Sequence, residues 1–405
     1  MEKFNVILLG SDDNVYGFAR TLYEEYKIKP YALTHHILNV TQCSKIINFV
    51  VNNNVHDEKM FPNILNNLVN ELKEKYEKII VIPCSDYYME LCVKYSKKIK
   101  NIENKFIDYK RFMEFNNKEK FYKLCDKYGI IYPKSYIINK KDYNKLLDNM
   151  DLSYPVILKP NNSNSDEYLN AKFDDKQKVY YINSLDELTK NIKNIYSSSY
   201  SDNLIIQQYI PGDDTNMRVL NVYCDSNAKV KLMSLGQPIL EEYHPNTYGN
   251  YASIISLTDH IDIMDKIKLF LEDVKYYGTA NFDIKYNMLD NKYYIFEINP
   301  RPGRSSFFTA CAGKSLASCY VEDLIFNNLE EHMNNDREIL WLNVPMILLK
   351  KYLNNDEIRR KIKKLDRYHT LIYKKDNSIK RKYIVYMNYI RKIKYFPKYY
   401  IKKWV

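Results

Sequence analysis

The segment 280–303 decides the fold, and it reads Ala280-Asn281-Phe282-Asp283-Ile284-Lys285 and, after a turn, Ile295-Phe296-Glu297-Ile298-Asn299-Pro300-Arg301-Pro302-Gly303. Side chains two residues apart on a strand share a face, so Glu297 and Asn299 lie on the same side of the second strand. A hairpin that turns at Asp290 places Asp283 directly opposite Glu297. Residues opposed in this way have Cβ atoms about 4.5–5.5 Å apart.

Two carboxylates at that distance repel each other unless a cation lies between them. Hard divalent cations prefer oxygen ligands, and Mg²⁺ usually combines one or two carboxylates with water and substrate phosphates. Asn299 offers a further oxygen, and Arg301, just past the strand, has a side chain that can bind a phosphate through two hydrogen bonds. The pattern therefore favours a magnesium–phosphate site. The alternative interpretation is an ordinary solvated face of a hairpin.

Two earlier segments carry groups that suit a nucleotide. Lys159 ends the apolar run 154–160 and precedes a loop of Asn and Ser, where a compact cation can point at a phosphate. The run 204–210 ends in Pro211-Gly212, which turns the chain, and Asp214 follows as an acceptor for ribose hydroxyl groups. Taken alone, Lys159 is more simply an ordinary residue at a strand end. The Pro211-Gly212 segment, taken alone, is more simply an ordinary surface turn.

The rest of the chain predicts a mixed α/β fold. At the N-terminus, apolar runs at 4–9, 31–33 and 79–82 alternate with helical stretches at 15–26 and 62–76, which is typical of a parallel α/β domain. The first turn, 10–17, lacks the G-x-G-x-x-G spacing of a dinucleotide site. Further on we expect helices and strands at 118–128, 135–138, 155–159, 178–182, 204–210, 217–224, 229–235, 261–276, 280–287 and 292–299.

The order of these signals over residues 1–328 resembles that of the ATP-grasp superfamily. The resemblance implies a Rossmann-like domain (1–110) and a two-lobed grasp that holds ATP between two antiparallel sheets. The small lobe (111–205) would carry the phosphate-binding lysines, and the C-terminal lobe (206–328) the hinge, the Mg²⁺ site and the substrate loops. A basic, Tyr-rich region (329–405) follows, in which we expect a helix near 355–365 and then strand or coil.

The resemblance also implies site residues, with ATP and Mg²⁺ as cofactors. Lys118 and Lys159 would contact the phosphates; Gln208, Tyr209 and Ile210 would line the adenine hinge; Asp214 would meet the ribose. Asp283, Glu297 and Asn299 would bind Mg²⁺, and Arg301 would stabilise the transferred phosphoryl group, with Lys159 as the second catalytic cation. For the donor carboxylate the candidates are Arg304, Ser305 and Ser306, with Arg218 as a weaker one.

Within the superfamily the chain looks most like the amino-acid ligases typified by D-aspartate ligase, on the residues Asn117-Lys118-x-x-Phe121-Tyr122, Gly129-x-x-Tyr132-Pro133, 157–160, 208–214 and 303–306. This implies an ATP-dependent carboxylate–amine ligase, an ADP-forming enzyme that makes an amide through an acyl phosphate. The donor would be an amino acid such as D-aspartate, and the acceptor an amine of a peptidoglycan precursor. Residues 241–250 stand where such ligases carry an acceptor or carboxylate loop. The loop 161–172 departs from many relatives because it contains no Gly.

Composition and charge add expectations about partners. The seven cysteines show no C-x-x-C spacing, which argues against a disulfide framework or a zinc site. Residues 341–405 hold 19 Lys or Arg and 4 Asp or Glu, while the whole chain has a net charge of +11. We expect a cytoplasmic protein and a homodimer, in which this region either is simply solvated or contacts the anionic inner membrane face, without nucleic acid. Two other functions stay open: a ligase for another peptide-like metabolite, and a non-catalytic nucleotide-binding protein whose basic tail binds membrane or nucleic acid.

Overall fold

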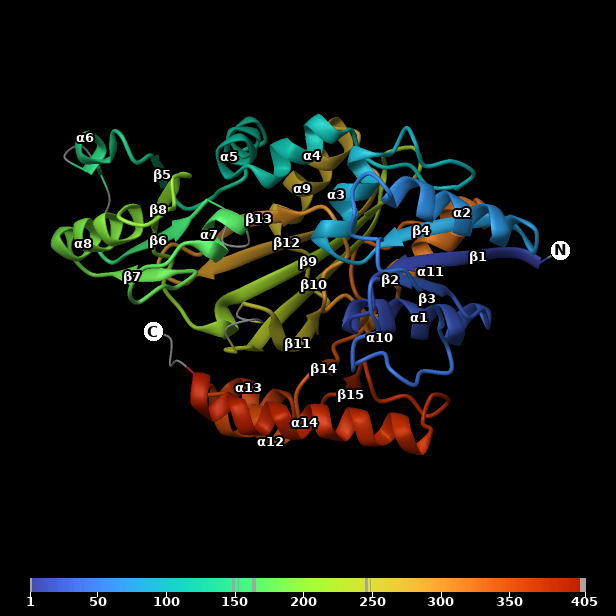
Figure 1. The fold of residues 1–405 in the computed structure, drawn as a ribbon. Helices are drawn as coiled ribbons and strands as arrows, with labels where there is room; N and C mark the ends of the chain where they lie inside the picture. The colour runs from blue at the N-terminus through green and yellow to red at the C-terminus, as the bar shows by residue number, and fades with distance from the viewer. Residues whose placement is uncertain are drawn as a thin grey trace.

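The computed structural model describes residues 2–147, 150–151, 153–161, 165–244, 247 and 249–400. Figure 1 shows an N-terminal domain on one side, a small lobe on the other, a large sheet between them and the C-terminal helices along one edge. The mixed α/β class predicted from the sequence is confirmed, with a parallel sheet, an antiparallel sheet and a large sheet that is antiparallel except for its last pair of strands.

The N-terminal domain is a parallel sheet of order β3-β2-β1-β4. Alternate residues of β1 enter the cores on its two faces: Val6 and Leu8 pack with α1, and Ile7 and Leu9 pack with α2 and α3. Asp12 ends the first turn as the N-cap of α1, accepting from two backbone N–H groups. The elements are β1 (Glu2–Leu9), α1 (Asp13–Tyr26), β2 (Tyr31–Thr34), β3 (Asn48–Val51), α2 (Phe61–Lys73), β4 (Tyr76–Pro83), α3 (Asp86–Lys94) and α4 (Tyr109–Asn116).

The small lobe is an antiparallel sheet of order β5-β8-β6-β7. Along β6, Val156 and Leu158 enter the lobe's core, so Lys159 must point to the other face of the sheet. Ile157, two residues before Lys159, lies on that same face. Gln207 pairs with Ile157 across the sheet and therefore lies on it too. The elements are α5 (Lys118–Lys127), β5 (Ser135–Ile138), α6 (Tyr143–Leu147), β6 (Val156–Pro160), α7 (Asp166–Asn170), β7 (Tyr180–Ile182), α8 (Leu185–Tyr196) and β8 (Leu204–Gln208).

The large lobe is built on a sheet of order β13-β12-β9-β10-β11-β14-β15. Its last two strands lie beyond residue 328, so part of the C-terminal region extends the sheet of the grasp. The elements are η1 (Asp214–Asn216), β9 (Met217–Cys224), β10 (Val230–Glu241), β11 (Tyr251–Leu257), α9 (Asp262–Asp273), β12 (Gly278–Asn287), β13 (Lys292–Asn299), α10 (Phe307–Ala312), α11 (Leu316–Val321), η2 (Glu322–Phe326), β14 (Leu340–Leu342) and β15 (Arg367–His369).

The C-terminal region corrects one expectation. After α12 (Met346–Tyr352) and α13 (Asp356–Lys361), the chain forms helix α14 (Ile379–Tyr399), where we expected strand or coil. Tyr and Ile favour strands, but Val385, Lys392 and Phe396 recur at helical spacing and are buried against the body. Packing of that face outweighs the local preference. None of the helices in the described part of the chain has the length and apolar character needed to cross a membrane.

Candidate active site

The acidic hairpin has the register predicted from the sequence. Asp283 of β12 pairs directly with Glu297 of β13, and Asn281 pairs with Asn299. The register shifts just after Asp283, so the hairpin is irregular at the point where the two carboxylates meet. All of these polar side chains come from the edge of the large sheet that faces the small lobe (Figure 1).

Asp283 is held by two neighbouring side chains. The Tyr251 hydroxyl, from β11, donates to its Oδ1 at 2.5 Å, and the Asn299 Nδ2 donates to its Oδ2 at 3.2 Å. Burial and the nearby charge of Glu297 raise the pKa of the Asp283 carboxyl. The two carboxylates therefore disfavour each other's charged form, and a bound cation would relieve this repulsion.

Lys118 neutralises the second carboxylate. Its Nζ lies 2.9 Å from the Glu297 Oε2, and this charge lowers the pKa of Glu297. Burial opposes the charge on Lys118, but Glu297 outweighs burial and raises the lysine's pKa. Burial and repulsion from Lys118 lower the pKa of Lys159 well below its usual value. The two predicted phosphate-binding lysines thus lie close together, beside the predicted metal ligands.

Gln207 connects Lys159 to the rest of the small lobe. Its Oε1 accepts from Lys159 Nζ at 2.8 Å, and its Nε2 donates to the hydroxyls of Tyr122 and Ser135, both at 2.9 Å. The sequence analysis assigned Gln208 to the adenine hinge and gave Gln207 no role. The alternation of side chains along a strand was a signal for Gln207, because Gln207 lies on the same face of the sheet as Lys159.

The hinge residues follow directly. The Gln208 N–H donates to the Lys134 carbonyl, the Tyr209 ring meets that of Tyr181 edge-on, and Ile210 is buried. Lys285, two residues past Asp283, donates to the Gly212 carbonyl at 2.7 Å and so ties the acidic strand to the hinge.

Asp214 is buried at the end of this segment. Its carboxylate accepts from the Tyr243 hydroxyl at 3.0 Å and from the Glu241 backbone N–H at 2.9 Å. A ribose would therefore have to share or replace the Tyr243 contact.

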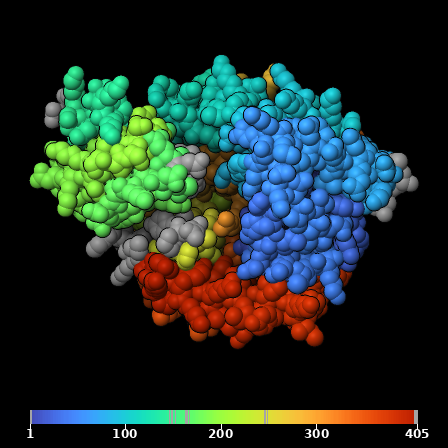
Figure 2. All heavy atoms as spheres, viewed as in Figure 1, coloured from blue at the N-terminus to red at the C-terminus, as the bar shows by residue number. Residues whose placement is uncertain are grey.

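A pocket of about 380 Å³ adjoins the acidic pair. It lies where the N-terminal domain, the small lobe and the large lobe meet, and Figure 2 shows the molecule hollowed between the first two. Arg301 crosses this junction: its Nε donates to the Asp86 Oδ1 at 2.7 Å and its Nη2 to the Oδ2 at 3.3 Å. The pocket is lined by Asp12, Cys84, Ser85, Asp86, Lys178, Gly249, Asn250, Tyr251, Asn281, Asp283, Glu297, Asn299, Arg301, Pro302, Gly303, Arg304 and Ser305.

The turn after β13 is fixed from the N-terminal domain. Asn14 of α1 donates to the carbonyls of Cys84 and Pro302, at 3.1 and 3.0 Å, and accepts from the Ser306 hydroxyl at 3.0 Å. Among the donor candidates, Arg304 and Ser305 line the pocket, while the Ser306 hydroxyl turns to Asn14. Asn14 was not singled out from the sequence, since nothing local links it to residues 302–306.

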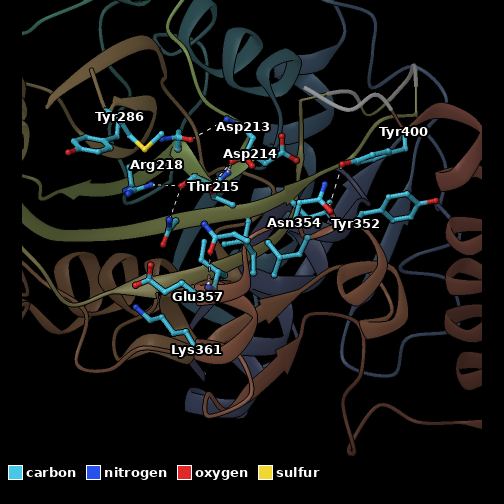
Figure 3. Close-up of a pocket in the computed structure, with 18 of the residues that line it drawn as sticks. Asp213, Asp214, Thr215, Arg218, Tyr286, Tyr352, Asn354, Glu357, Lys361 and Tyr400 are labelled. Carbon is cyan, nitrogen blue, oxygen red and sulfur yellow. Dashed lines mark hydrogen bonds between the residues drawn. The ribbon is translucent and has the colours of Figure 1, made fainter. Parts of the chain in front are cut away.

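Arg218 is not brought to this pocket. Val219, rather than Arg218, pairs with Asp283 across β9 and β12, so Arg218 points to the opposite face of the sheet. There it donates to the carbonyls of Thr215 and Met217 and lines, together with Asp214, a second pocket of about 490 Å³ (Figure 3). Its position on the opposite face from Asp283 argues against a role in donor binding.

Two predicted loops are described only in part. Residues 162–164 of the Gly-free loop lie outside the described residues, as do residues 245, 246 and 248 of the segment 241–250. What is described shows Glu242 N–H donating to the Asn250 carbonyl at 2.7 Å. This bond closes the base of the second loop next to the pocket that Asn250 lines.

The side-chain oxygens of the acidic hairpin fit a hard divalent cation. Two opposed carboxylates supply oxygen atoms, and the Asn299 amide oxygen, which accepts from the Arg301 Nη2 at 3.3 Å, lies beside them. Two lysines and Arg301 surround them, as binding of a polyphosphate requires.

Comparison with known proteins identifies the family of the chain. A scan of protein-family models found no match. The chain is 37% identical to the D-aspartate ligase of Enterococcus faecium (strain Aus0004) over 411 residues, covering 97% of this chain and 96% of that protein. The chain belongs to the D-aspartate ligase family. It is an ATP-grasp carbon–nitrogen ligase of the ADP-forming, carboxylate–amine type.

Solved structures share the fold of this D-aspartate ligase family member at low identity. An N5-carboxyaminoimidazole ribonucleotide synthetase in complex with ADP superposes with a TM-score of 0.59 at 14% identity, covering 84% of this chain and 81% of that one. The L-amino acid ligase of Bacillus licheniformis gives a TM-score of 0.57 at 12% identity, covering 84% and 79%. These likenesses establish the ATP-grasp architecture.

Proposed function

We propose that the chain uses Mg²⁺ and ATP to activate a carboxylate of an amino acid, D-aspartate, as an acyl phosphate and joins it to an amine of a peptidoglycan precursor. The observation that carries this proposal is the pocket in which Asp283, Glu297 and Asn299 meet the turn 301–305. A relative matched over nearly its whole length supports the choice of donor.

The reaction has two steps. A donor carboxylate oxygen attacks the γ-phosphorus, the bond to the β-phosphate oxygen breaks, and ADP leaves. The amine nitrogen then attacks the acyl carbon, the carbon–oxygen bond to phosphate breaks, and the nitrogen loses a proton as the amide forms. Such chemistry needs positioning and charge neutralisation more than a side-chain nucleophile.

The chain's residues supply both needs. Lys118 and Lys159 hold the phosphates, and Arg301 neutralises charge on the transferred group. Asp283, Glu297 and Asn299 would hold Mg²⁺, which would offset the negative charge of the phosphates. Lys118 now pairs with Glu297, so binding of ATP with its metal exchanges that partner for phosphate oxygens.

We assign substrate recognition to three regions. Gln208, Tyr209 and Ile210 would line the adenine, partly through backbone groups, and Asp214 the ribose. Arg304, exposed in the pocket, would pair with the donor's second carboxylate, and Ser305 would donate beside it. A homodimer and contact of part of residues 341–405 with an anionic membrane complete the proposed partners.

The test is ADP release with Mg²⁺ATP across D- and L-amino acids, with hydroxylamine as a surrogate amine. We expect a hydroxamate from D-aspartate that disappears in Glu297→Gln and persists in Glu119→Gln, an exposed acid on α5. A hydroxamate from another amino acid would point to a different peptide-like product. Tight ATP binding with no hydroxamate from any donor would support a non-catalytic nucleotide-binding protein.

The acceptor is tested separately. Mass spectrometry should show D-aspartate added to a precursor peptide with a free side-chain amine, and no addition when that amine is acetylated. Ligation to small amines alone would contradict a peptidoglycan acceptor.

A further inference from the structure

Helix α14 carries two apolar stripes, and only one is covered. Val385, Tyr389, Lys392 and Phe396 pack against the body. The second stripe starts with Ile379, Tyr383 and Tyr386, which are 88%, 64% and 64% exposed. Their spacing of four and three residues puts them on one face of the helix. Three large side chains exposed together in this way mark an interaction surface.

A groove widens this apolar surface. It has a volume of about 600 Å³ and lies between the first half of α14 and the segment 371–377. Its lining is chiefly apolar and includes Ile372, itself 51% exposed. We call this groove, together with Ile379, Tyr383 and Tyr386, the α14 surface. In Figure 1 the helix runs along the outer edge of the molecule, and Figure 2 shows the C-terminal residues as one continuous face.

The exposed charges that residues 371–386 contribute to the α14 surface are all positive. Lys374, Lys375, Lys380 and Lys382 are exposed beside it. Residues 367–405 contain one acid, Asp376, which is buried and accepts from the hydroxyls of Tyr16 and Ser44. The surface therefore combines exposed Ile and Tyr with uncompensated cations.

The structure also shows which basic residues are not free for a partner. Arg381 is buried over the Tyr16 ring, and Lys392 donates to Glu242 at 2.7 Å. The basic excess of the region is thus divided between cations that attach α14 to the body and lysines that face outward.

We propose that the α14 surface docks on an anionic lipid bilayer. Tyr and Ile of an amphipathic helix partition into the boundary between headgroups and acyl chains, and flanking lysines attract anionic headgroups. A second copy of the chain fits less well, because a face without acids would meet the same lysines. The proposal rests on the membrane contact included in the proposed function and assigns it to the α14 surface, and it does not depend on the ligase reaction or its donor.

The test is co-sedimentation of the full chain with vesicles at physiological salt. We expect binding to vesicles of phosphatidylglycerol and phosphatidylcholine, and little binding to phosphatidylcholine alone. Lys380→Gln/Lys382→Gln should lower the partition coefficient about 30-fold, from about fivefold for each lysine near an anionic surface. The matched control is Lys97→Gln/Lys100→Gln, exposed lysines after α3, which should bind as the wild type does.

A second pair of variants tests the apolar part. Ile379→Ser/Tyr383→Ser should weaken binding at least tenfold, whereas Leu289→Ser, an 82% exposed residue at the β12–β13 turn, should not. ADP release without vesicles should be unchanged in every variant, which shows that the chain is folded. Equal binding by wild type and all variants would overturn the proposal. The proposal would also be overturned if only Lys380→Gln/Lys382→Gln lost vesicle binding and single-stranded RNA competed equally well with vesicles. That result would indicate a surface that binds nucleic acid.

Discussion

Lys392 of α14 donates to Glu242, just past the end of β10, at 2.7 Å, and both side chains are buried. The same lysine donates to the Asn343 carbonyl at 2.7 Å, and Tyr395 donates to the other Glu242 oxygen at 3.2 Å. Glu242 closes the loop whose far end, at Asn250, lines the reaction pocket. The C-terminal helix therefore contacts the start of the segment 241–250, 150 residues earlier in the chain.

Removing one partner of this pair should be costly. Lys392→Met leaves a buried carboxylate without its cation, so we expect a loss of about 3–5 kcal/mol in the free energy of unfolding by urea. Lys392→Met/Glu242→Gln should recover most of that loss, because no unpaired charge remains. Lys123→Met, which breaks an exposed pair with Glu119, is the control and should change little. Equal losses in the single and double variants would contradict an ion-pair role.

The same pair predicts a pH dependence. Burial opposes ionisation of Glu242, but Lys392 outweighs it and lowers the carboxyl's pKa. The stability from the ionised group is therefore present above the unfolded pKa of about 4.3 and is lost as pH falls through the lowered folded value. The difference in unfolding free energy between wild type and Lys392→Met should be largest near pH 7 and shrink below about pH 4. A constant difference from pH 7 to pH 3 would contradict this.

Arg301 should act on the chemical step. Arg301→Ala removes charge from the transferred group, so we expect kcat for ADP release to fall about 10²–10³-fold with the KM for ATP nearly unchanged. Arg301→Lys should recover only part of the lost kcat, because Lys cannot make the pair of hydrogen bonds that Arg301 makes to the two Asp86 oxygens. A rise in KM with kcat unchanged would assign Arg301 to ground-state binding instead.

The donor site should distinguish two arginines. Arg304→Gln removes a charged contact to the donor, and we expect its KM to rise about 10–100-fold. Arg218→Gln should leave that KM within about twofold, because Arg218 points to the other face of the sheet. The opposite ranking would place the donor in the pocket of Figure 3.

Asn14 should act as a positioning residue. Asn14→Ala removes the side-chain donor to the Cys84 and Pro302 carbonyls and the acceptor of the Ser306 hydroxyl, at a cost of about 1–3 kcal/mol in unfolding free energy. Because it frees the turn 302–306, it should also raise the donor KM more than the KM for ATP. Asn70→Ala, at an exposed amide contact, is the control. Equal effects on the two KM values would indicate general loosening.

Local sequence determined the acidic hairpin. The turn at Asp290 and the two-residue period of a strand are short-range features, and they suffice to oppose Asp283 and Glu297. Three strands of the parallel N-terminal domain, β1, β2 and β4, were equally accessible because they are short apolar runs, whereas β3 was not predicted. These features depend on neighbours within a few residues, so they could be predicted without knowing the fold.

Only the tertiary structure decided the rest of the site. The partners of Lys118, Arg301 and Asn14 lie 179, 215 and 288 residues away, and no local pattern encodes such distances. Helix α14 forms where Tyr and Ile favour a strand, because burial of one helical face in the body stabilises it more than local preference opposes it. The face of the sheet to which Arg218 points likewise depends on which strands pair. Sequence fixes short-range register, whereas packing of distant segments decides which charges meet.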